Sequence, residues 1–178
     1  MHVNNKNVIH NNELYALSVL LGTTLKREKK WITCAESCTG GWVAKMITDV
    51  AGSSNWFKCG FVTYSNQAKI DLLNVRHGTI EQHGAVSDAV VKEMACGALR
   101  AASADYAVAI SGIAGPDGGT VEKPVGMVWF GFALAEGALF SQLMHLEGDR
   151  NSVRRQAVHL ALGMLFATSS EHALCPAL

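Results

Sequence analysis

The sequence has no excess of charge of either sign. Its 178 residues include 15 Lys and Arg against 15 Asp and Glu, so the formal net charge is zero. Proteins that bind nucleic acid without sequence preference carry a basic excess, and we therefore expect no nucleic-acid partner. Charged residues make up only 17% of the chain. Because a poorly charged surface favours association, we expect a homo-oligomer, with a dimer as its simplest form.

Paired metal-binding and disulfide motifs are also missing. The five cysteines are an odd number and form no C-x-x-C pair, and the seven histidines form no H-x-x-x-H. This pattern predicts a protein of the reducing cytoplasm with no metal site. We also expect no other cofactor. A basic start followed by a long apolar run is absent, and the most apolar stretch, residues 125–135, is too short to span a bilayer. We therefore expect neither a secretory signal nor a membrane partner.

Helical and strand-like segments alternate along the chain. Apolar periodicity predicts helices over residues 12–28, 42–48, 65–73, 79–83, 88–102 and 149–168. Strands are expected at 31–35, 56–64, 106–110, 125–135 and 138–145, the last two joined as a hairpin at Glu136-Gly137. This order predicts an α/β fold with a mixed, mainly parallel sheet that contains at least one antiparallel strand. We expect one domain over 1–178, with a frayed start at 1–10.

A glycine-rich turn follows the first predicted strand, with the sequence Ala-Glu-Ser-Cys-Thr-Gly-Gly at 35–41. Ser37 and Thr39 place hydroxyls in the turn, and Gly40 and Gly41 let backbone amides approach a ligand. The start of the following helix would favour an anion or a developing oxyanion. Alternatively, Ser37 or Thr39 simply caps that helix.

A lysine lies shortly after the second predicted strand. Lys69 could accept the proton of a serine hydroxyl if partial burial lowered its pKa, and Tyr64 could orient or relay that proton. No histidine lies near either segment, so a Ser-Lys pair fits better than a Ser-His-Asp triad. The alternative is an exposed helix lysine and a tyrosine at a strand end.

A second glycine-rich loop follows the strand at 106–110. Ser111, Gly112 and Gly115 would bring a hydroxyl and backbone donors to another strand end, where open α/β sheets bind ligands. The alternative is a flexible connection. Arg150, Arg154 and Arg155 open the last helix, and arginine suits phosphate, although Arg154 and Arg155 fit a solvated charged turn better.

Together these segments resemble a known family, the C-terminal domain of the competence/damage-inducible protein CinA, and in particular its stand-alone nicotinamide-nucleotide amidases. The resemblance runs in the family's order from residue 13 to residue 166. The matching motifs are Ala-Glu-Ser-Cys-Thr-Gly-Gly (35–41), Gly-Ser-Ser (52–54), Val-Thr-Tyr-Ser-Asn (62–66) with Lys69, Gly-Ala-Val-Ser (84–87), Ser-Gly-Ile-Ala-Gly-Pro (111–116), Glu-Lys-Pro-Val-Gly (122–126) and Gly-Asp-Arg (148–150).

The resemblance implies a three-layer α/β/α sandwich that hydrolyses nicotinamide mononucleotide to nicotinate mononucleotide and ammonia, in pyridine-nucleotide salvage. It implies Ser37 as the nucleophile, Lys69 as its base and Tyr64 as a supporting group. Ser111 would be a pocket hydroxyl and Arg150 a contact to the phosphate. The substrate-binding candidates are then Thr39, Gly40, Gly41, Ser111, Gly112, Gly115 and Arg150.

Two other hypotheses remain open. Cys38 adjoins Ser37, and a helix start lowers the pKa of a thiol, so Cys38 could be the nucleophile instead. A relative that binds a pyridine nucleotide without cleaving it would carry much the same motifs and would release no ammonia.

Overall fold

The computed structural model describes residues 9–174 and contains five strands and six α-helices. The strands are β1 (Ile32–Glu36), β2 (Phe57–Val62), β3 (Tyr106–Gly112), β4 (Met127–Leu134) and β5 (Leu139–His145). The helices are α1 (Asn11–Glu28), α2 (Trp42–Thr48), α3 (Asn66–Leu73), α4 (His77–His83), α5 (Asp88–Ala102) and α6 (Arg150–Leu174), with a short 3-10 helix η1 (Ser53–Asn55). Most of the frayed start expected for 1–10 lies outside the described residues, and His10 directly precedes α1.

The five strands form one sheet in the order β2-β1-β3-β4-β5. β1 pairs in parallel with both β2 and β3, whereas β3 with β4 and β4 with β5 pair antiparallel. The expected mixed sheet with at least one antiparallel strand is confirmed: the two kinds of pair are equal in number, and β4 is the strand that runs opposite to the other four. The long loop after β3 brings β4 back alongside β3 in the opposite direction, and the hairpin then adds β5.

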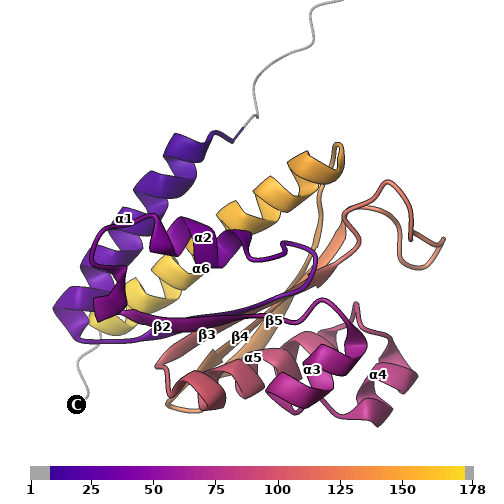
Figure 1. Ribbon diagram of the computed structural model, residues 1–178, viewed down its shortest axis with the longest axis horizontal. Helices are drawn as coiled ribbons and strands as arrows, with labels where there is room; N and C mark the ends of the chain where they lie inside the picture. The colour runs from indigo at the N-terminus through magenta and orange to yellow at the C-terminus, as the bar shows by residue number, and fades with distance from the viewer. Residues whose placement is uncertain (1–8, 175–178) are drawn as a thin grey trace, which may run out of the picture.

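Helices cover both faces of the sheet, as Figure 1 shows. α1, α2 and α6 lie on one face, and α3, α4 and α5 lie on the other. The loop between β3 and β4 extends away from both layers at one end of the sheet (Figure 1). In the described part of the chain, none of the helices combines the length and the hydrophobicity that a membrane span needs.

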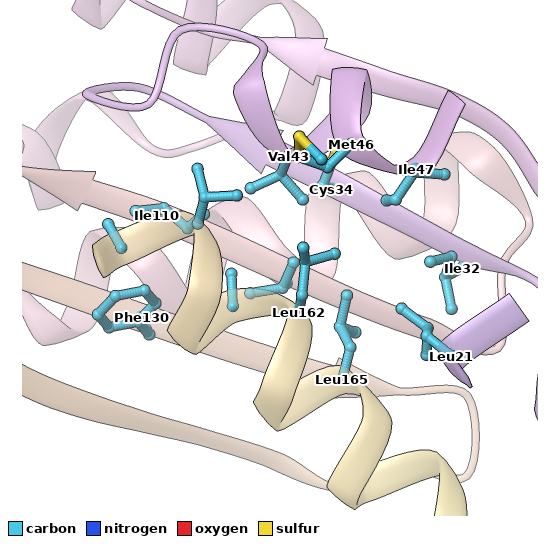
Figure 2. Packing of buried hydrophobic residues seen from close by; sticks show 14 of the residues in the cluster. Leu21, Ile32, Cys34, Val43, Met46, Ile47, Ile110, Phe130, Leu162 and Leu165 are labelled. Atoms are coloured by element: carbon cyan, nitrogen blue, oxygen red, sulfur yellow. The ribbon is translucent and has the colours of Figure 1, made fainter. Parts of the chain in front are cut away.

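The first face carries the larger hydrophobic core. Leu21 of α1, Ile47 of α2 and Leu162 of α6 point toward β1 and β3, where they meet Ile32 and Ile110 (Figure 2). All five side chains are fully buried. Burying an aliphatic side chain of this size contributes about 1.5–3 kcal/mol. This packing fixes α6 along the sheet, so that its start, with Arg150, lies by the loop that follows β3.

The second face is built on α5, which positions α3. Gly97 of α5 lies so close to the end of α3 that a Cβ there would be 2.0 Å from the carbonyl oxygen of Leu73. Only glycine allows this approach. α3 begins with the Ser65 hydroxyl accepting the amide of Ala68 at 3.0 Å, which confirms the expected cap. These two contacts fix both ends of the helix that carries Lys69.

The last helix begins as predicted and ends later. The amide of Ser152 donates to the Asp149 carboxyl at 2.8 Å, so the expected cap of α6 is confirmed. The helix continues past residue 168 to Leu174. Ser169 does not stop it, because its hydroxyl is buried and donates to the carbonyl of Phe166.

Candidate active site

The carboxyl ends of the three parallel strands meet at one edge of the sheet. Ser37 follows β1, Tyr64 follows β2, and the loop that contains Gly115 follows β3. In open α/β sheets this edge is the usual place for a ligand. The structure therefore brings together segments that are far apart in the sequence, and the start of α6 adds Arg150 to them.

Lys69 reaches this edge from α3 and contacts Ser37. Its Nζ donates to the Ser37 Oγ at 3.1 Å, to the Thr63 carbonyl at 2.8 Å and to the Ser65 carbonyl at 3.5 Å. The side chain is only 1% exposed and has no carboxylate partner among these contacts. A lysine buried in this way is not the solvated helix lysine that the sequence left open.

Burial changes the acidity of Lys69. Because desolvation penalises the ammonium form, it lowers the pKa of Lys69 below its ordinary value of 10.5, and this effect exceeds the opposite one of the nearby Cys38. A lowered pKa enlarges the fraction of neutral amine near neutral pH. Ser37 and Lys69 thus have the distance and the electrostatics that a nucleophile and its general base require.

Tyr64 and Arg150 form a second pair beside the first. Arg150 donates to the Tyr64 hydroxyl at 3.3 Å and to the carbonyl of Gly115 at 2.8 Å. Both side chains are exposed, Tyr64 by 63%. Among the described contacts the Tyr64 hydroxyl bonds to Arg150 and not to Ser37 or Lys69. Tyr64 and Arg150 therefore form a polar rim that joins the loops after β2 and β3.

Ser111 and Gly112 end β3 within the body of the protein. Ser111 is 1% exposed, and its hydroxyl donates to the Ala85 carbonyl at 2.8 Å. At Gly112 a Cβ would meet the Met127 carbonyl oxygen at 2.8 Å. Ser111 thus ties β3 to the turn before α5, and Gly112 lets β4 approach.

The turn after β1 differs from the expected anion site. Glu36 belongs to β1 rather than to the turn, is fully buried, and accepts the amides of Gly41, Val43 and Ala44 at 2.8–3.1 Å. A protein carboxyl group therefore already occupies the start of α2, and the expectation that these amides are free for a ligand is wrong. Gly40 and Gly41 adopt positive φ angles of 62° and 92°.

Thr39 lies inside this turn. It is fully buried, and its hydroxyl has no hydrogen-bond partner among residues 9–174. Ser37 is partly exposed, so of the two hydroxyls only that of Ser37 reaches the edge of the site.

Sequence reasoning missed two charged residues around this turn, Glu36 and Arg154. Arg154 donates to the carbonyls of Cys38 and Thr39 and is half-buried, so it does not belong to a solvated turn. The available signal was helical spacing: residues 150 and 154 are four apart and therefore share one helix face. For Glu36, the signal was an acidic residue shortly before a helix start.

The environment of Cys38 disfavours it as a nucleophile. The side chain is 7% exposed, and burial raises the pKa of the thiol from 9.0 to about 12. The amides at the start of α2, which would have lowered that pKa, donate to Glu36 instead. Cys38 therefore carries no reactive thiolate near neutral pH.

No group of three or more His, Cys, Asp or Glu side chains that could hold a metal ion occurs in the described part of the chain. The candidate site is instead a serine with a buried lysine, bordered by a tyrosine, an arginine and two glycine-containing loops.

Fold, site and sequence agree on a class of protein. Residues 14–169 match the model of the CinA C-terminal domain, and the chain belongs to this family.

Individual relatives agree with this assignment. The chain is 61% identical over 154 residues to the nicotinamide-nucleotide amidohydrolase PncC of Escherichia coli, covering 86% of this chain and 93% of the relative. It is 49% identical over 156 residues to a protein of the same name from Pseudomonas putida, covering 87% and 96%. Among solved structures, the competence/damage inducible protein CihA from Agrobacterium tumefaciens superposes with a TM-score of 0.86 at 39% identity, covering 90% of this chain and 98% of that one.

Proposed function

We propose that this protein is an amidohydrolase that converts nicotinamide mononucleotide to nicotinate mononucleotide and ammonia, as a step of pyridine-nucleotide salvage. The observation that carries the proposal is the hydrogen bond between buried Lys69 and Ser37. It occurs in a chain that is 61% identical to a nicotinamide-nucleotide amidohydrolase and covers 93% of that relative's length.

In the first half of the reaction Ser37 attacks the carboxamide. Neutral Lys69 takes the hydroxyl proton across the 3.1 Å contact as the Oγ bonds to the amide carbon. The carbon–nitrogen bond then breaks, and the protonated lysine returns that proton to the leaving nitrogen, which departs as ammonia. The product of this half is an ester between Ser37 and the nicotinoyl nucleotide.

The second half hydrolyses this ester. Water loses a proton to Lys69 as it attacks the ester carbon, and the Ser37 oxygen leaves and takes that proton. Each tetrahedral intermediate places negative charge on the former amide oxygen, which needs a preorganised donor. Within the first turn, Glu36 and the Ser37 carbonyl already hold the amides of Gly41 and Gly40. The amides of Cys38 and Thr39, which make neither of these bonds, are then the candidate donors in this turn.

The polar rim suits the far end of the nucleotide. Arg150 is exposed, offers a planar set of donors and is tied to the Gly115 carbonyl, so it can meet a phosphate without first being ordered. Tyr64 shares this position through its contact with Arg150. We assign phosphate recognition to Arg150 and the orientation of Arg150 to Tyr64.

The proposal is tested by measuring ammonia and nicotinate mononucleotide after the purified protein is mixed with nicotinamide mononucleotide. We expect both products in equal amounts. Free nicotinamide, which lacks the ribose phosphate, is the matched control and should react far more slowly. Tight binding of the nucleotide without ammonia release would identify a non-hydrolytic binding protein and overturn the proposal.

The Cys38→Ala protein is expected to retain most of its ammonia release. The Cys38 thiol is buried with a pKa of about 12, so the reaction does not depend on it. Iodoacetamide should likewise leave the wild-type rate unchanged. If Cys38→Ala abolished turnover in a folded protein while Ser37→Ala did not, the nucleophile would be the cysteine.

Ammonia release is expected to survive exhaustive dialysis against a chelator, since the Ser-Lys scheme assigns no step to a metal. The assay compares dialysed protein with and without added Zn²⁺ or Mg²⁺. Loss of activity that either ion restored would replace the scheme with metal-assisted hydrolysis.

A further inference from the structure

Charged groups hold the turn that carries Ser37 from two opposite sides. On its amide side, Glu36 Oε2 accepts the amides of Gly41 at 2.9 Å and Val43 at 3.1 Å, and Oε1 accepts that of Ala44 at 2.8 Å. The Glu36 carboxyl is fully buried. These bonds fix the end of the turn to the end of β1.

On the carbonyl side of the same turn, Arg154 supplies two further bonds. Its Nε donates to the Cys38 carbonyl at 3.0 Å and one Nη donates to the Thr39 carbonyl at 2.8 Å. The guanidinium lies over the ring of Trp42, 5.4 Å from its centroid. A Cβ at position 40 would lie 3.3 Å from the Arg154 guanidinium, which is a tight contact. Glycine at this position therefore leaves room for Arg154 to approach the turn.

The turn needs such support because its own backbone can adopt several conformations. It contains two adjacent glycines at positive φ, and glycine adopts many other conformations at little cost. Ser37 is at the start of this segment, and its Oγ must stay within hydrogen-bond distance of Lys69. A displacement of about 1 Å at a reacting group can lower turnover about 100-fold.

We propose that Arg154 and Glu36 are positioning residues that clamp the turn from its carbonyl and amide sides, so that Ser37 is held against Lys69. This role rests on the proposed amidase function. Arg154 acts through the turn rather than on the substrate, because the two bonds that it donates end on backbone carbonyls. It belongs to α6, so the clamp joins the nucleophile turn to the helix that also supplies Arg150.

The neighbouring residue provides a matched control. Arg155 also comes from α6 and also lies over Trp42, at 5.2 Å, but it donates to the Ile9 carbonyl and to Asn11 instead of to the turn. Arg155→Ala therefore removes the same charge from the same helix and ring, and leaves the clamp intact.

In kinetic assays with nicotinamide mononucleotide, Arg154→Ala is expected to lower kcat about 100-fold with little change in KM, because the turn is displaced while the substrate contacts remain. Arg155→Ala should leave kcat near the wild-type value. Arg154→Lys should lie between wild type and Arg154→Ala, since an ammonium cannot contact both carbonyls in the same fork geometry. A rise in KM with unchanged kcat would instead make Arg154 a substrate contact and overturn the proposal.

A second measurement does not depend on activity. Cys38 lies in the clamped turn and Cys34 lies in β1, and both are buried. Below the unfolding temperature, iodoacetamide labelling mapped by peptide mass should proceed at least about tenfold faster at Cys38 in Arg154→Ala than in wild type, because local opening exposes groups that the rigid state protects. Labelling of Cys34 should stay slow in both proteins, and Arg155→Ala should behave as wild type.

The two measurements separate the clamp from the proposed function. Selective labelling of Cys38 in Arg154→Ala, together with a wild-type protein that releases no ammonia, would support the clamp and reject the amidase. Unchanged Cys38 labelling in Arg154→Ala, or an equal rise at Cys38 and Cys34, would reject the clamp whatever the activity.

Discussion

The Ser37→Ala protein is expected to fold normally and to release ammonia from nicotinamide mononucleotide at least about 10⁴-fold more slowly than wild type. Ser37 is the hydroxyl that lies 3.1 Å from the Lys69 amine, so its loss removes the bond-forming atom and leaves only binding and electrostatic effects. Stopped assays of ammonia, with thermal unfolding of both proteins as the control for folding, provide the measurement.

The serine assignment would be wrong if Ser37→Ala kept a rate near that of wild type. Cys38→Ala is the matched variant, since it removes the neighbouring side chain of the same turn. We expect a large loss of ammonia release for Ser37→Ala and a small one for Cys38→Ala.

The second large effect is expected at Lys69. A general base must be able to lose its proton, and arginine does not do so in proteins. We therefore expect Lys69→Arg to be about as damaging to kcat as Lys69→Ala, with nucleotide binding retained in both. Binding is measured by calorimetry and turnover by ammonia release. A Lys69→Arg protein that kept a large part of wild-type turnover would show that this position supplies charge rather than proton transfer, with Tyr64 as the next candidate base.

The pH dependence follows from the same residue. Burial lowers the pKa of Lys69 below 10.5, and the active form is the neutral amine. Turnover should therefore rise with pH until the lowered pKa is passed and then level off. A rate that fell as pH rose through this range would contradict a lysine base.

Much of the architecture follows from local sequence patterns. The caps at Ser65 and Asp149 and the alternation of helices with strands were predictable, because each depends on residues a few positions apart. The place of the antiparallel hairpin beside β3 could not be predicted, since it depends on how the 113–126 loop returns to β3. Such a path is set by tertiary contacts rather than by periodicity.

In the candidate site, too, local sequence patterns predict some residues, whereas the roles of others depend on tertiary contacts. Ser37, Lys69 and the loop at Gly115 could be selected because glycines, hydroxyls and a lysine follow predicted strands. Glu36 was placed in the turn, and its contact with the start of α2 depends on β1 running one residue further. The role of Arg154 depends on α6 crossing above the turn. Arg154 and Cys38 are 116 positions apart in the sequence, so no local pattern connects them.

An ester between Ser37 and the nicotinoyl nucleotide can be detected by peptide mass analysis of the wild-type protein quenched in acid during its first turnovers. We expect a Ser37 peptide heavier by the mass of nicotinamide mononucleotide minus ammonia. This peptide should be absent from Ser37→Ala and should be lost as nicotinate mononucleotide accumulates. An adduct on Cys38, or ammonia released in the first turnover with the Ser37 peptide unmodified at every quench time, would contradict the Ser37 ester.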